Sequence, residues 1–84
     1  MNDAERWIAD YLRRDGDAGD VDLGPLLDVN FVERGLLDSL ALVALIADLE
    51  DRFDVRLDAE QMQDPAFMTI RGMAAAVGRS RAAA

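Results

Sequence analysis

The sequence contains no histidine and no cysteine among its 84 residues. Without histidine it can form neither a Ser-His nor a Cys-His catalytic pair, and it offers no imidazole ligand to a metal. Without cysteine it has no disulfide, no zinc-thiolate cluster and no thiol nucleophile of its own. These two absences exclude most of the chemistry that a single chain can perform unaided.

Basic residues are also scarce, because nine arginines and no lysine stand against 17 acidic residues and leave a formal net charge of −8. Such a charge repels a phosphodiester backbone, so we expect basic protein partners and no nucleic acid. The acidic residues are concentrated in the middle of the chain: residues 1–14 have no net charge, residues 15–64 have a net charge of −11 and residues 65–84 have a net charge of +3. This pattern indicates either a face that meets a positive surface or a solvated rim that keeps a small protein soluble.

Long apolar runs are missing as well. No stretch approaches 18 uncharged apolar residues, and the N-terminal MNDAERWIAD has charges where a signal peptide would be apolar. We therefore expect a soluble, cytoplasmic monomer without a membrane span. A chain of this length buries only about 60% of the surface that it exposes when unfolded. Residues 1–84 should thus form a single domain with a small core.

The residues that are present have mostly helical spacing. Residues 3–14 place apolar side chains at i, i+1, i+4 and i+5 from Trp7, with acidic residues early and arginines late, as the helix dipole favours. The next stretch, residues 15–38, has several glycine turn signals and is too long for an ordinary connection. Its apolar residues should anchor it across the core: Leu23, Leu26, Leu27, Val29 and Phe31.

Residues 39–53, SLALVALIADLEDRF, contain neither glycine nor proline and predict the most regular helix. One apolar stripe on it should face the core: Leu42, Leu45, Ile46, Leu49 and Phe53. A second stripe lies on another face: Leu40, Val43, Ala44 and Ala47. So small a domain can hardly bury both stripes, which favours the second as a partner-contact surface. The alternative is that the long loop covers it.

A short helix is expected after the linker that follows. Asp58 and Gln61 have the spacing of a capping box and predict a helix over residues 58–63, which Asp64-Pro65 should end.

Thr69 can cap a last helix over residues 70–77, with Gly78 as its stop and residues 79–84 as a frayed tail. Strand-like alternation is limited to one weak candidate, FDVRL at residues 53–57. The predicted fold class is therefore all-α: a four-helix bundle of three main helices and one short helix, with a long loop between the first and second helices.

Two familiar ligand-binding motifs fail on spacing. An EF-hand loop starting at Asp15 would need glycine at its sixth position and glutamate at its twelfth, and it finds Asp20 and Leu26. The six glycines form neither a dinucleotide-binding nor a P-loop pattern. We therefore expect no metal site and no nucleotide site.

The remaining candidate is Ser39, in GLLDSL, where the long loop meets the most regular helix. One interpretation is structural: Asp38 or Ser39 is the N-cap of that helix. The other is functional: a phosphate esterified to the Ser39 hydroxyl would lie at a helix N-terminus, where free N–H groups and the macrodipole favour an anion. The two interpretations are compatible.

Taken together, residues 30–77 resemble an acyl carrier protein of the phosphopantetheine-dependent superfamily. The resemblance is carried by GLLDSL, the apolar helix ending in EDRFDV, the short helix after it, and Thr-Ile opening a last helix. It implies a four-helix bundle with a phosphopantetheine arm on Ser39, and Asp38 helping to present that serine to a phosphopantetheinyl transferase. It also implies that partner enzymes recognise the helix beginning at Ser39.

This implication fits the composition and the second stripe. A carrier needs a thiol to hold an acyl group as a thioester, and since the chain has none, the cofactor must supply it. Acidic residues near the second stripe, such as Asp48 and Asp51, would steer partners with basic rims to the helix, through contacts that are individually weak. The expected partners are a phosphopantetheinyl transferase, an adenylating ligase or acyltransferase, and downstream enzymes. The surface expected to meet them consists of Leu40, Val43, Ala44, Ala47, Asp48 and Asp51.

The motif also differs between kinds of carrier. Fatty-acid carriers usually have Gly-Ala-Asp-Ser-Leu-Asp and acids early in this helix, whereas here Leu36 and Leu37 precede Asp-Ser, and Ala41 and Ala44 follow. Peptidyl carriers more often show paired glycines before the serine. FVERGLLDS and the stretch at residues 65–70 are more similar to the free-standing D-alanyl carrier type, which works with a separate adenylating ligase.

The sequence thus predicts a free-standing acyl or aminoacyl carrier in a specialised biosynthetic pathway, a substrate shuttle and not an enzyme. The alternative from another class is a small acidic helical module that binds partners without a cofactor.

Overall fold

Helices supply the regular structure of residues 1–83, the part of the chain that the computed structural model describes; side chains are described for residues 1–81. The four α-helices are α1 (Asp3–Arg14), α2 (Ser39–Phe53), α3 (Ala59–Gln63) and α4 (Ile70–Ala83), and two short 3-10 helices are η1 (Gly24–Leu26) and η2 (Pro65–Met68). The predicted all-α fold with a long connection between α1 and α2 is confirmed. Over the described residues no strand forms, so FDVRL, the one weak strand candidate, is not a strand.

The helices begin where the capping signals lie. Asn2 and Glu5 form a capping box at the start of α1, each side chain accepting a hydrogen bond from the other's backbone N–H at 2.8 Å. Asp58 and Gln61 form a second capping box at the start of α3, as their spacing predicted. Thr69 Oγ1 accepts from the N–H of Gly72 at 2.9 Å and caps α4.

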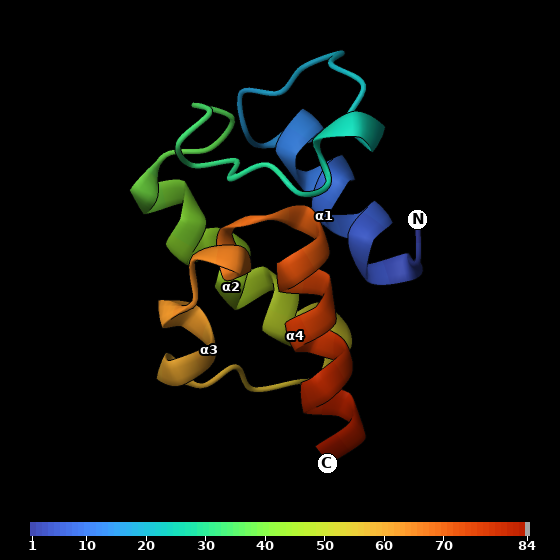
Figure 1. Cartoon of the computed structure of the whole chain (residues 1–84), viewed down its shortest axis with the longest axis vertical. Coiled ribbons are helices and arrows are strands. Elements are labelled where there is room, and N and C mark those ends of the chain that lie inside the picture. Colours follow the sequence, from blue (N-terminus) through green and yellow to red (C-terminus); the bar gives the residue numbers. More distant parts are fainter. Residues whose placement is uncertain (84) are drawn as a thin grey trace.

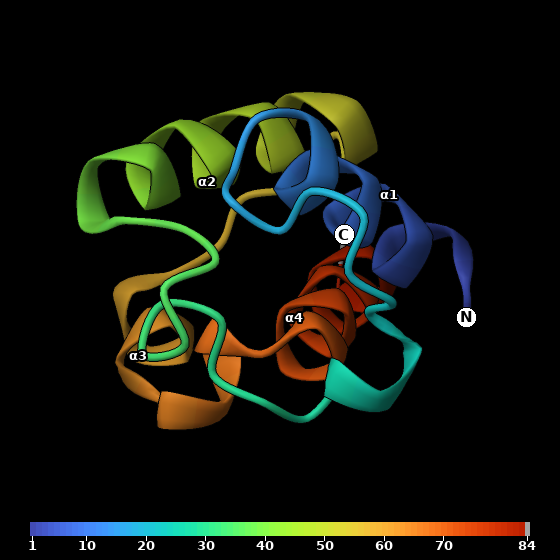
Figure 2. The same cartoon turned by 90° about the horizontal axis from the view of Figure 1, so that it is seen from above.

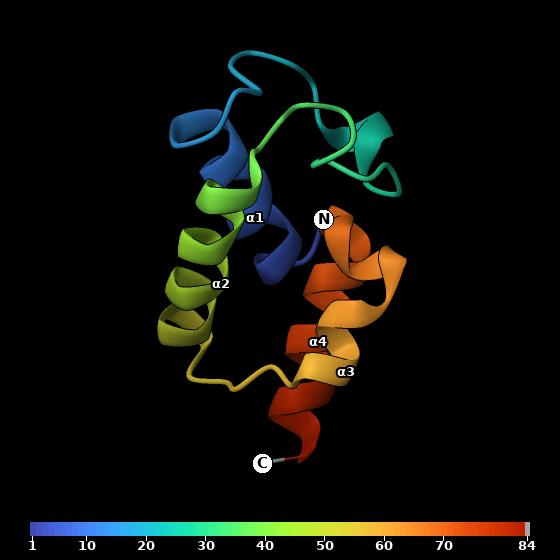
Figure 3. The same cartoon turned by 90° about the vertical axis from the view of Figure 1, so that its left-hand side faces the viewer.

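The helices can be described as two pairs on opposite sides of the core, and α1 of the first pair packs directly against α4 of the second. Figure 3 shows α1 and α2 on one side of the molecule, α3 and α4 on the other, and the long connection across the top. The linker from α2 to α3 crosses at the opposite end (Figure 1). Seen from above, α2 lies along the edge of the molecule, with one face turned outward (Figure 2).

The core draws side chains from both pairs of helices and from the long connection. Its largest fully buried side chains are Phe31, Ile8, Leu12, Leu23, Leu37, Leu45, Leu49, Ile70, Met73 and Val77. Along α2, Leu45 and Leu49 are buried, whereas Leu42, Ile46 and Phe53 are half-buried against the cluster. The first apolar stripe therefore faces the core as expected.

The long connection is tied to the second helical pair. Phe31 is buried, and its N–H donates to the carbonyl of Met68 at 2.9 Å. The N–H of Arg71 donates to the carbonyl of Leu27 at 3.0 Å, and the Arg71 guanidinium lies 3.2 Å from the carboxylate of Asp28. These contacts confirm that apolar anchors lay the connection across the core.

The end of α4 differs from the prediction. Gly78 was expected to stop the helix, but α4 continues through it to Ala83. The glycine has no positive φ, and the residues after it include arginine and alanine, which favour helix. Fraying of residues 79–84 stays a prediction, and residue 84 lies outside the described residues. Among residues 1–83, no helix combines the length and apolar character needed to span a membrane.

Candidate functional site

The candidate site begins where the long connection becomes α2. Asp38 is the N-cap: its backbone is extended, and its Oδ1 accepts a hydrogen bond from the N–H of Ala41 at 2.7 Å. Its carbonyl accepts from the N–H of Leu42 at 2.9 Å, which starts the helical ladder. The sequence left open whether Asp38 or Ser39 caps the helix, and the structure assigns that task to Asp38.

Ser39 is therefore free of the capping role. It is the first residue of α2, and its side chain is exposed. The residue two positions before it, Leu37, is buried in the core with 2% of its surface exposed. The buried Leu37 thus holds the backbone that leads to Ser39, while the serine hydroxyl is exposed to solvent.

The surroundings of Ser39 suit an esterified phosphate. The first N–H groups of a helix have no partner within the helix, and the positive end of the macrodipole lies there. Within the first turn of α2 there is no acidic residue, and the carboxylate that precedes it, Asp38, is bonded to the N–H of Ala41. A phosphodiester on Ser39 Oγ would lie where backbone donors and the dipole favour an anion.

The second apolar stripe is exposed. Leu40 and Val43 expose 86% and 67% of their surfaces, and Ala44 and Ala47 are exposed too. The alternative expectation, burial of this stripe under the long loop, was wrong. Large apolar side chains left in water contribute no burial free energy to folding. An exposed stripe of this kind is typical of a surface that another protein covers.

Acidic residues follow the stripe toward the far end of α2. Asp51 lies eleven residues after Leu40, close to three full turns, and so continues the same face. Asp48 lies at the edge of that face, and both carboxylates are exposed.

Asp48 also influences α1. Burial of the Tyr11 phenol raises its pKa above 10.0, the neighbouring Asp48 and Asp15 carboxylates raise that pKa further, and Arg14 partly opposes them. Tyr11 therefore stays protonated where the two helices meet. The sequence could not indicate this pairing, because it depends on how α1 and α2 are aligned.

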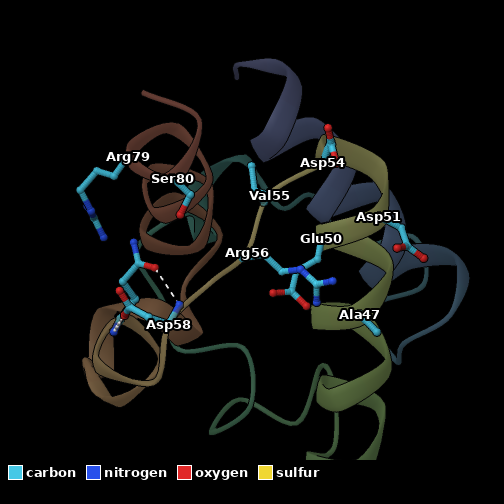
Figure 4. Close-up of a pocket in the computed structure, with 10 residues that line it drawn as sticks. Ala47, Glu50, Asp51, Asp54, Val55, Arg56, Asp58, Arg79 and Ser80 are labelled. Atoms are coloured by element: carbon cyan, nitrogen blue, oxygen red, sulfur yellow. Dashed lines mark hydrogen bonds between the residues drawn. The ribbon is translucent and has the colours of Figure 1, made fainter. Parts of the chain in front are cut away.

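A hollow of about 780 Å³ lies beside the second half of α2, and Figure 4 shows residues that line it. Residues of α2, of the linker, of α3 and of α4 line it: Ala47, Glu50, Asp51, Asp54, Val55, Arg56, Asp58, Gln61, Arg79 and Ser80. Two of its carboxylates accept hydrogen bonds from the backbone: Glu50 Oε2 from the N–H of Leu57, and Asp58 Oδ1 from the N–H of Gln61. Among the side chains of residues 1–81, no cluster of acidic ligands could hold a metal ion.

Comparisons with known proteins found similar sequences. A model of the family described as "Phosphopantetheine attachment site" matches residues 7–77. Two curated relatives are each named D-alanyl carrier protein, one from Streptococcus sanguinis (strain SK36) and one from Streptococcus gordonii (strain Challis). Each is 38% identical over 40 residues, which are 48% of this chain and 51% of the relative. The chain thus spans about half the length of the curated relatives it matches. No solved structure matches the chain.

Proposed function

The chain belongs to the family that carries the phosphopantetheine attachment site, and on that premise we propose that Ser39 holds the arm. Carriers of this family bear phosphopantetheine covalently on a serine and are not catalysts. The sequence has two serines, Ser39 and Ser80, and the family match at residues 7–77 includes only the first. This single observation, with the exposure of Ser39 at the start of α2, carries the proposal.

The residues around Ser39 have separate tasks in this proposal. Asp38 holds the first turn of α2 through its hydrogen bond to Ala41, which orients the serine that follows it. Because the chain contains no cysteine, the arm supplies the thiol on which an acyl or aminoacyl group is carried as a thioester. The protein itself presents the serine and binds its partners.

The exposed face of α2 is the proposed docking surface. Its apolar part lies next to Ser39, and its acidic part lies farther along the helix. The partners would be a phosphopantetheinyl transferase and an adenylating ligase or acyltransferase with an apolar contact surface and a basic rim. The residues proposed to contact them are Leu40, Val43, Ala44, Ala47, Asp48 and Asp51.

The names of the relatives indicate which kind of group the arm would carry. Both are D-alanyl carrier proteins, so we propose an aminoacyl or other small acyl group loaded by a separate adenylating ligase in the cytoplasm. Loading assays with D-alanine, other amino acids and aryl acids on the modified protein would identify the group.

The attachment site is tested by incubating the protein with coenzyme A and a promiscuous phosphopantetheinyl transferase and recording its intact mass. We expect a gain of one phosphopantetheine in the wild type and in Ser80→Ala, and none in Ser39→Ala. An unmodified wild type, or the same gain in Ser39→Ala, would contradict the proposal.

The docking surface is tested separately by substitutions at two exposed apolar positions. Val43→Asp should lower the rate at which the transferase modifies the protein at least tenfold, because the substitution puts a charge in the middle of the apolar contact. Ala75→Asp adds the same charge at an exposed position of α4 and should have little effect. Equal effects of the two substitutions would mean that α2 is not the contact surface.

A further inference from the structure

The backbone at Gly16 lies unusually close to the segment that leads into Ser39. A Cβ atom placed on Gly16 would lie 2.7 Å from the carbonyl oxygen of Leu36, 2.9 Å from that of Leu12 and 3.2 Å from the side chain of Leu37. The first two distances are shorter than van der Waals contact allows, and both neighbours are backbone atoms that cannot rotate away. Only glycine fits here without a shift.

This close approach is not a matter of backbone conformation. The positive-φ glycines of the described residues are Gly19 and Gly35, and Gly16 is not among them. Its φ angle would suit other residue types, so the need for glycine comes from the space alone.

Hydrogen bonds join the same two segments. The N–H of Asp17 donates to the carbonyl of Leu36 at 2.9 Å, and the N–H of Ala18 donates to the carbonyl of Leu12 at 3.3 Å. Ala18 is buried with 3% of its surface exposed. The turn after α1 is thus hydrogen-bonded both to the end of α1 and to the Leu36 carbonyl.

A second anchor holds the same segment from the other side. The N–H of Leu36 donates to the carbonyl of Phe31 at 2.9 Å, and the N–H of Phe31 donates to the carbonyl of Met68 in η2 at 2.9 Å. Leu36 therefore has both of its backbone groups bonded, one toward α1 and one toward the second helical pair.

From these contacts we infer that Gly16 is a positioning residue for the attachment serine. The turn at residues 16–18 holds the Leu36 carbonyl, Leu37 is buried beside it, and the next two residues are Asp38 and Ser39. Gly16 never touches the hydroxyl. It fixes the three-residue approach to Ser39, so that the hydroxyl meets the transferase at a constant position. The inference rests on the proposed attachment of the arm to Ser39.

The first test uses hydrogen exchange in the unmodified wild type. The Asp17 amide should exchange at least tenfold more slowly than an unprotected amide, because it is bonded to the Leu36 carbonyl. An Asp17 amide that exchanges at the unprotected rate would overturn the inference, whatever the transferase does.

The second test compares Gly16→Ala with two controls in the transferase assay. A mutation far from the chemistry that misplaces a reacting group by about 1 Å can lower a rate by about 10²-fold. In Gly16→Ala we expect kcat to fall at least tenfold and KM to change less than threefold, since the docking face of α2 is unaltered. Val77→Ala loses core packing and Gly78→Ala changes a glycine in open space, and both should keep the wild-type kcat.

The outcomes separate this inference from the proposed function. A wild type that accepts no arm contradicts the proposed function. A wild type that is modified normally, together with a folded Gly16→Ala of unchanged kcat, contradicts the positioning role alone. A fall in kcat shared by Gly16→Ala and an equally destabilised Val77→Ala would likewise overturn it, because stability would then explain the loss. Should Gly16→Ala fail to fold, the hydrogen-exchange result on the wild type decides.

Discussion

Trp7 on α1 and Phe53 at the end of α2 meet edge to face, with their ring centroids 5.9 Å apart and their planes at 82°. The ring centroid of Tyr11 lies 5.4 Å from that of Trp7, and the Arg52 guanidinium lies 5.0 Å from the centroid of the Phe53 ring. The pair fixes the end of α2 that lies farthest from Ser39 against the first helix.

Replacing Phe53 should therefore loosen this end of α2. An edge-to-face pair contributes about 1 kcal/mol beyond its area, so Phe53→Leu should lower the free energy of unfolding by about that amount and Phe53→Ala by about 2–3 kcal/mol. Trp7 is the sole tryptophan, so urea unfolding followed by its fluorescence measures both effects. If Phe53→Leu and Phe53→Ala unfold at the wild-type midpoint, the contact does not stabilise the fold.

Because Asp38 caps α2 and Ser39 does not, alanine should have unequal effects on stability at these adjacent positions. Asp38→Ala removes the N-cap and should cost about 1 kcal/mol, whereas Asp38→Asn keeps the acceptor and should cost less. Ser39→Ala should change stability by less than about 0.5 kcal/mol, because the exposed hydroxyl does not cap the helix. Thermal unfolding by circular dichroism checks the three variants, and a loss in Ser39→Ala equal to that in Asp38→Ala would contradict this assignment.

The raised pKa of Tyr11 predicts a loss of stability in alkali. Because the folded protein holds this proton more tightly than the unfolded chain, the contribution of Tyr11 is complete below about pH 10. It is lost as the pH rises through the folded pKa. Absorbance of the tyrosinate reports this group alone, since Tyr11 is the single tyrosine.

Two variants test the causes of that shift. Asp48→Asn removes one of the carboxylates that raise the Tyr11 pKa, so the titration midpoint should fall toward 10.0. Tyr11→Phe should remove the part of the alkaline stability loss that this phenol causes. A midpoint unchanged in Asp48→Asn would mean that burial and Asp15, without Asp48, raise the pKa.

Two glycines of α4 should respond to alanine in opposite directions. A Cβ on Gly72 would overlap the backbone carbonyl of Ala66, so Gly72→Ala must displace η2 and should lower stability by about 2 kcal/mol or more. A Cβ on Gly78 would meet nothing within 4 Å, so Gly78→Ala should raise stability by about 0.5–1 kcal/mol through better helix propensity. Urea midpoints measure both changes, and the prediction fails if their order is reversed.

Much of this fold could be predicted because its signals are local. The bounds of α1 and α2 follow from apolar spacing, and the start of α3 follows from the capping box of Asp58 and Gln61. The end of α4 could not be read in the same way, because Gly78 is a stop signal only when its φ is positive. Nothing in the sequence states that angle.

The residues of the candidate site likewise differ in whether local sequence signals predict them. The exposed stripe of Leu40 and Val43 was predicted from the sequence, since a small core cannot cover two faces of one helix. The sequence motif also gave Ser39 as the proposed attachment residue. Gly16 was not identified, because its importance depends on the Leu36 carbonyl, which lies twenty residues away along the chain and reaches it only through the fold.

The exposed face of α2 also affects how the molecules behave toward one another. Leu40 and Val43 would form a self-adhesive patch, and at neutral pH the net charge of −8 keeps copies apart. Near the isoelectric point of about 4.2 that mutual repulsion vanishes while the patch stays uncovered. The surface proposed to contact partners should therefore make the protein prone to aggregation in mild acid, where α2 of one copy can cover α2 of another.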